Sequence, residues 1–150
     1  HAPHEICVFD EKSGAVCTGD AMGLYLEQGV VLLPNAVLPD FDLARGLDSI
    51  ERIRKLGPAA LLFAHFGACF RVEETIDTMT TILNRWEDIA MKAARNEGIG
   101  RVVPVLKEYG RGQIEALRSS PALYDPMSRQ IVPMIAAAYE KHCKSRMSMI

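Results

Sequence analysis

The sequence predicts an α/β protein in which a small sheet with one flanking helix is followed by a mainly helical half. Short apolar runs of strand length occur at residues 5–9, 15–18 and 59–64. Between the last two runs, residues 43–56 carry apolar side chains at helical spacing. After residue 67 the spacing is helical throughout. A helix that is followed by a strand indicates a helix laid on a sheet.

The overall composition is that of an ordinary globular domain. The chain has 150 residues, 49% of them hydrophobic and 24% charged, and its net charge is -2. This balance predicts no nucleic-acid partner and no attraction to anionic membranes. No apolar run reaches the ~20 residues of a membrane-spanning helix. The four cysteines have no metal-knuckle spacing. Cys7 and Cys17 could approach each other across a hairpin, but reduced cysteines in a cytoplasmic protein are the favoured interpretation.

The first two runs predict a β-hairpin. EICVF and AVCT are separated by DEKSG, whose Asp, Ser and Gly are typical of a hairpin turn. If the turn pairs Asp10 with Ala15, Asp20 comes opposite Glu5. Residues 21–42 are interrupted by glycine and proline and predict a loop with at most one short strand, near residues 30–33.

The remaining elements are predicted from helix signals. Asp40 or Asp42 can cap a helix from Leu43, and Gly57-Pro58 ends it. The buried strand at 59–64 then leads to His65. Three further helices are expected: a long one near residues 76–96, one at 102–118 weakened by Gly110 and Gly112, and one after Pro126 that Pro133 could kink.

Three polar residues lie where predicted elements end, and this is where binding groups are commonly placed. His1 precedes the first strand, Asp20 follows the second, and His65 follows the strand at 59–64. Histidine nitrogens with a carboxylate are a typical ligand set for zinc or a similar divalent metal. Four extended residues would separate His1 from Glu5 by roughly 13 Å, so Pro3 has to bend the chain back toward Asp20.

These residues lie in segments that resemble a known family. HAPHE, then VFDEKSGAVCTGDA, then LLFAHFG resembles, in order and spacing, the carboxy-terminal half of the metallo-β-lactamase superfamily. The helical segment is loosely similar to the glyoxalase II-like branch. The resemblance implies half of an αββα sandwich, with residues 1–67 as the carboxy-terminal part of the metallo-β-lactamase-like domain and residues 68–150 as a helical extension.

The resemblance also implies roles for individual residues. His1 corresponds to the third histidine ligand of the first metal site, Asp20 to the catalytic aspartate that bridges two metals, and His65 to the last histidine, a ligand of the second site. The implied cofactors are two divalent metal ions, zinc by preference, with iron or manganese as alternatives. The implied activity is hydrolysis of an ester, thioester or lactone by a metal-bridging hydroxide. Tyr25, in the loop after Asp20, is a candidate substrate contact.

The sequence departs from the family pattern in two places. Residues 1–150 contain no HxHxDH motif, because the only histidines are His1, His4, His65 and His142. His4 also occupies a position where the family usually has glycine. We therefore expect a carboxy-terminal fragment of a larger enzyme. Its expected partners are a small-molecule substrate and either the missing amino-terminal half or a second copy of the chain, which makes a homo-oligomer.

Two alternatives stay open at this point. One is a non-catalytic interaction or dimerisation module derived from the same fold, in which an uncovered apolar sheet face drives association. The other is a metal-free helical protein with incidental histidines. His4 and Glu5 are interpreted as an exposed strand edge, with a supporting role at the site as the alternative, and His142 as a partly buried core residue.

Overall fold

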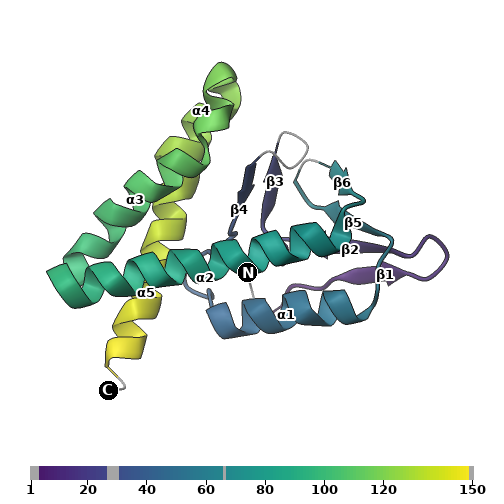
Figure 1. Ribbon diagram of the computed structural model, residues 1–150, viewed down its shortest axis with the longest axis horizontal. Coiled ribbons are helices and arrows are strands. Elements are labelled where there is room, and N and C mark those ends of the chain that lie inside the picture. The colour runs from purple at the N-terminus through teal and green to yellow at the C-terminus, as the bar shows by residue number, and fades with distance from the viewer. Residues whose placement is uncertain (1–3, 27–30, 66, 149–150) are drawn as a thin grey trace. The chain divides into compact units, whose positions relative to one another are not determined.

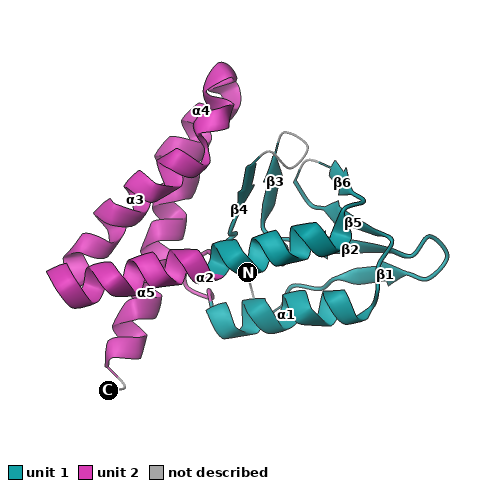
Figure 2. Ribbon diagram, in the orientation of Figure 1, with its two compact units in different colours: residues 1–35, 42–83 teal, residues 36–41, 84–150 magenta. Residues whose placement is uncertain are grey.

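The computed structural model describes residues 4–26, 31–65 and 67–148, and it has the mixed α/β class that the sequence predicts (Figure 1). The chain divides into two compact units (Figure 2). Unit 1 comprises residues 1–35 and 42–83, and unit 2 comprises residues 36–41 and 84–150. Within the described ranges, no helix combines the length and the apolar character needed to cross a membrane.

Unit 1 contains a four-stranded sheet of order β1-β2-β5-β6. Its strands are β1 (Val8–Asp10), β2 (Ala15–Gly19), β5 (Ala60–Phe63) and β6 (Gly67–Cys69). The predicted hairpin register is confirmed, since Asp10 pairs with Ala15 in the antiparallel β1–β2 ladder. Strands β2 and β5 are parallel neighbours. The prediction that the chain is helical after residue 67 was wrong for β6, which pairs with β5 and ends the sheet.

The two faces of this sheet differ in exposure. One row across the strands is largely buried: Phe9, Val16, Leu61 and Cys69. The adjacent row, which we call the exposed sheet face, consists of apolar side chains that all reach solvent: Val8, Cys17, Leu62 and Ala68. Successive side chains of a strand point to opposite faces, so these two rows lie on opposite faces of the sheet. Burial of the exposed face is limited to its next row, where Ala15 and Ala60 are buried.

Two further strands form a small separate sheet. β3 (Leu24–Leu26) and β4 (Val31–Leu33) pair antiparallel, and all their side chains are buried. The prediction of at most one strand in this region was wrong. The flanking glycine and proline residues indicated a loop, whereas strands this short depend on tertiary packing, such as the stacking of Tyr25 on Phe63.

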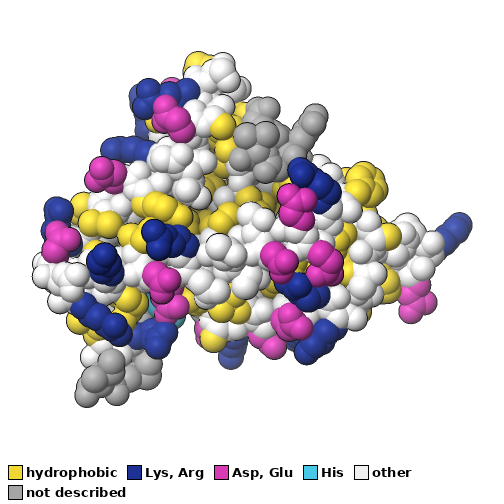
Figure 3. All heavy atoms as spheres, viewed as in Figure 1, with side chains coloured by type: hydrophobic (Ala, Val, Ile, Leu, Met, Phe, Trp, Pro, Cys, Tyr) yellow, Lys and Arg dark blue, Asp and Glu magenta, His cyan; other side chains and the backbone are white. Residues whose placement is uncertain are grey.

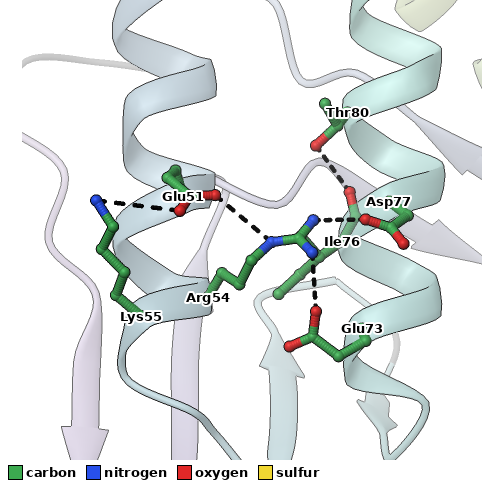
Figure 4. A network of polar contacts seen from close by, with 7 residues as sticks. All are labelled: Glu51, Arg54, Lys55, Glu73, Ile76, Asp77 and Thr80. Atoms are coloured by element: carbon green, nitrogen blue, oxygen red, sulfur yellow. Dashed lines mark hydrogen bonds and ion pairs between the residues drawn. The ribbon is translucent and has the colours of Figure 1, made fainter.

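Helix α1 (Leu43–Lys55) begins and ends close to the predicted positions. The Asp42 side chain accepts a hydrogen bond from the Arg45 amide and caps the helix. Arg54 near its end joins α1 to the first turns of helix α2 (Val72–Glu97). Its guanidinium binds Glu73 at 2.8 Å and Asp77 at 2.6 Å (Figure 4).

Unit 2 is helical. It contains the second part of α2, the 3₁₀ turn η2 (Ile99–Arg101), α3 (Val102–Gln113), the 3₁₀ turn η3 (Glu115–Ser119), α4 (Pro121–Pro126), the π-helical turn η4 (Met127–Ile131) and α5 (Val132–Met147). The helix predicted for 102–118 therefore ends early, at Gln113. Pro133 is the second residue of α5 and directly follows the π-helical turn η4, so the regular α-helical pattern is interrupted just before this proline. Trp86 and Tyr139 are the largest fully buried side chains of this unit.

The cysteines form no disulfide among the described residues. The Cys7 thiol donates a hydrogen bond to the Thr18 carbonyl oxygen at 3.3 Å, and Cys17 belongs to the exposed sheet face. The hairpin therefore does not pair the two thiols.

Candidate functional site

The site is built where two parallel strands end. Asp20 directly follows β2, and His65 comes two residues after β5. The last link between these strands is the Ala64 amide, which donates to the Gly19 carbonyl oxygen at 3.4 Å. Asp20 and His65 each follow one partner of this hydrogen bond. Because parallel strands end at the same edge of a sheet, Asp20 and His65, which are far apart in the sequence, are brought together there.

The residues before Asp20 fix its position. The Thr18 side chain is fully buried, and its hydroxyl donates to the Leu62 or the Gly19 carbonyl oxygen, each at 3.2 Å. Gly19 has a φ of +54°, a conformation that favours glycine and turns the chain out of the strand. Thr18 therefore holds β2 against β5, Gly19 makes the turn, and Asp20 is presented at the sheet edge.

Glu5 supports the turn from the neighbouring strand segment. Its carboxylate accepts a hydrogen bond from the Asp20 amide. A side chain at Gly19 would place its Cβ 2.6 Å from the same carboxylate oxygen, so the contact also depends on glycine. The sequence analysis left Glu5 between an exposed edge and a supporting role. The structure places it in contact with the Asp20 backbone, as the Asp10–Ala15 register predicts.

The distance between Asp20 and His65 is suitable for shared metal binding. His65 Nε2 lies 3.3 Å from Asp20 Oδ1, and the two side chains are 50% and 21% exposed. Two ligands bound at about 2.0–2.1 Å to one tetrahedral zinc ion are separated by roughly 3.3–3.4 Å. An imidazole nitrogen and a carboxylate oxygen thus fit a divalent metal ion in both type and spacing. In residues 4–26, 31–65 and 67–148, no third His, Cys, Asp or Glu joins them in a cluster.

The other histidines are separate from this pair or outside the structure. His1 lies outside the described residues, so its predicted role as a ligand stays a prediction. His4 is exposed. His142 belongs to unit 2, where its Nε2 lies 3.1 Å from Glu87 Oε1 and its side chain is only 17% exposed, as expected for a partly buried core residue.

Tyr25 is placed chiefly as a packing residue. It is 7% exposed and stacks on Phe63 at 4.6 Å between ring centroids. Burial, followed by a hydrogen bond with Cys69, raises the pKa of its hydroxyl. The cavity that it lines, beside Arg71 and Thr75, has a volume of about 50 Å³. That space suits water better than an acyl substrate. Substrate contact by Tyr25 stays a prediction.

Comparison of the chain with protein-family models, with curated proteins and with solved structures finds no match. The functional argument therefore rests on the residues and the geometry described above.

Proposed function

We propose that residues 1–150 form the carboxy-terminal half of a metallo-β-lactamase-like hydrolase that acts on an ester, thioester or lactone. The observation that carries the proposal is the 3.3 Å pairing of Asp20 with His65 at the end of two parallel strands. The resemblance of HAPHE, TGD and AHFG to the family assigned metal-binding roles to these two residues, and the fold places their side chains side by side.

A second observation supports the sandwich architecture. The exposed sheet face is apolar in every one of its four positions, while the opposite row is largely buried. Two sheets of a sandwich pack through apolar side chains at about 10 Å separation. An uncovered apolar face is what one layer of an αββα sandwich would present to the other layer.

The chain's own residues would perform three tasks in this proposal. Asp20 and His65 would bind the metal ions, together with His1 and with ligands from outside these residues. Glu5 would hold the Asp20 backbone, so that the carboxylate keeps its direction. Divalent metal ions in such a site lower the pKa of water and polarise a scissile carbonyl. The half-exposed imidazole of His65 leaves room for a substrate to approach.

The exposed sheet face also favours a second candidate function. A non-catalytic interaction module would use Val8, Cys17, Leu62 and Ala68 to bind another copy of the chain or the other half of the sandwich, without any metal. The two functions differ in whether Asp20 and His65 bind metal.

Metal titration distinguishes them. We expect Zn²⁺, added to the purified chain and followed by isothermal titration calorimetry, to bind with a stoichiometry of at least one ion per chain. Asp20→Asn and His65→Ala should each weaken the binding by tenfold or more, because each removes one ligand. Co²⁺ should give a d–d absorption spectrum that both variants lose.

The matched control is His4→Ala, which removes an exposed imidazole three residues from His1 and should leave Zn²⁺ affinity unchanged. His1→Ala should weaken binding as His65→Ala does. Circular dichroism of each variant establishes that it is folded. Zn²⁺ affinity that is unchanged in both the Asp20 and the His65 variants would overturn the hydrolase proposal and favour the interaction module.

A further inference from the structure

A groove in unit 1 lies between helix α1 and the segment that precedes β1. Its volume is about 400 Å³, within the range of about 300–1,000 Å³ that small-molecule sites occupy. One wall is Glu5, Ile6 and Cys7, and the other comes from α1 and its C-cap residue: Ser49, Arg52, Ile53 and Leu56. All these residues belong to the same compact unit, so the groove is internal to one body.

Arg52 is the cation of this groove, and the carboxylate of Glu5 belongs to the opposite wall. In the described part of the chain, Arg52 is the one basic side chain of α1 without a carboxylate within 4 Å. Arg45 pairs with Asp42, Lys55 with Glu51, and Arg54 with three carboxylates. Residues two apart on a helix are about 200° apart around its axis. Arg54 therefore faces α2 (Figure 4), whereas Arg52 lies on another side of the helix and lines the groove.

The walls next to Arg52 are apolar and open to solvent. Ile6 is 76% exposed and Leu56 48% exposed, and they lie on opposite walls of the groove. Burial, followed by the charge of Glu5, raises the pKa of the Cys7 thiol, which keeps it neutral. The Glu5 carboxylate accepts a hydrogen bond from the Asp20 amide at the sheet edge, and the Ser49 hydroxyl donates a hydrogen bond to the Arg45 carbonyl oxygen. Arg52 is thus the group in the groove that can bind an anion.

We propose that this groove is a binding site for a small carboxylic acid with an aliphatic tail. The carboxylate pairs with the Arg52 guanidinium, which can bind it through two parallel N–H donors. The tail lies between Ile6 and Leu56 and shields both from water. This inference stands on the groove alone and does not depend on metal binding at Asp20 and His65.

The test is a titration of the ¹⁵N-labelled chain with octanoate, followed by NMR. We expect saturable shifts of the Ile6, Cys7, Arg52 and Ile53 amides. Arg52→Gln should weaken octanoate binding at least tenfold. Octylamine, which has the same tail and the opposite charge, should not saturate these amides, and neither should acetate, which lacks the tail.

The matched control is Lys55→Gln, which removes one positive charge from the same helix outside the groove and should change octanoate affinity less than twofold. Ile6→Ser leaves the charge in place and should weaken octanoate binding without affecting the fold, since Ile6 is exposed. The proposal is overturned if octanoate shifts other amides instead, if Arg52→Gln binds it as tightly as the parent chain, or if octylamine binds equally well.

Discussion

At the scale of single residues, the TGD segment shows how three adjacent side chains divide the work of one site. Thr18 is buried and bonded across to β5, Gly19 takes a positive φ, and Asp20 projects at the sheet edge. The motif was singled out from the sequence for its aspartate. The structure adds that the two preceding residues determine where that aspartate lies.

Gly19→Ala should therefore destabilise the fold. An alanine at φ +54° costs about 1–2 kcal/mol, and its Cβ would also crowd the Glu5 carboxylate. Gly46→Ala is the matched control, because Gly46 lies in α1 with no atom within 4 Å of the added Cβ, and it should stabilise by about 0.5–1 kcal/mol. Urea unfolding measures both values, and equal effects of the two substitutions would contradict this account.

At the scale of elements, a polar cluster joins α2 to α5 in unit 2. Glu87 of α2 lies 3.1 Å from His142 and 2.5 Å from Arg146 of α5. Burial alone would raise the pKa of Glu87. Hydrogen bonds and charges from His142 and Arg146 outweigh burial, so the pKa of this carboxyl is lowered overall.

The lowered pKa predicts a loss of stability in acid. A carboxyl with a depressed folded-state pKa contributes stability above its unfolded value, about 4.3 for Glu, and loses that contribution as the pH falls through the folded value. The urea concentration at the unfolding midpoint should therefore decrease as the pH is lowered from about 5 to about 3. Glu87→Gln should lower stability at pH 7 by about 1 kcal/mol and flatten this acid dependence.

Glu140→Gln is the control for the Glu87 experiment. Glu140 forms an ion pair with Lys144, four residues further along α5. The side chain of Lys144 is 55% exposed. Such exposed pairs contribute little, so the acid dependence should remain in this variant. If Glu87→Gln keeps the full acid dependence, the cluster is not its cause.

At the scale of the whole molecule, charged and apolar side chains are distributed differently over the surface. In the view of Figure 3, the described Lys and Arg side chains are interspersed with Asp and Glu, in keeping with a net charge of -2. On the face drawn there, neither sign of charge forms an extended patch. The exposed sheet face, by contrast, presents four apolar side chains in one row.

We expect the chain to self-associate through this face at high concentration. Leu62→Glu should weaken the association at least tenfold in sedimentation equilibrium, because it places a charge in the centre of the face. Leu38→Glu is the control, since Leu38 is exposed to a similar degree, 41% against 36% for Leu62, and lies outside the sheet. Association that resists Leu62→Glu would show that another surface is responsible.

Elements that are specified by local signals could be predicted from the amino-acid sequence. The Asp42 cap and the Gly57-Pro58 end bound α1, the DEKSG turn specified the hairpin register, and helical spacing located α2 and α5. Each depends on residues within a few positions of one another, so each could be predicted without the fold. The resemblance of short motifs identified Asp20 and His65 as candidates.

Contacts between residues far apart in the sequence depend on the packing of the elements and could not be predicted in this way. Strands β3 and β4 are short and are stabilised by burial, so periodicity did not reveal β3. The 3.3 Å pairing of Asp20 with His65 requires β2 and β5 to be parallel neighbours. Arg52 and Arg54 lie on different sides of α1, and packing places carboxylates of α2 beside Arg54 and the groove beside Arg52. A linear pattern specifies which face of an element is apolar, but the partner of that face is fixed by packing.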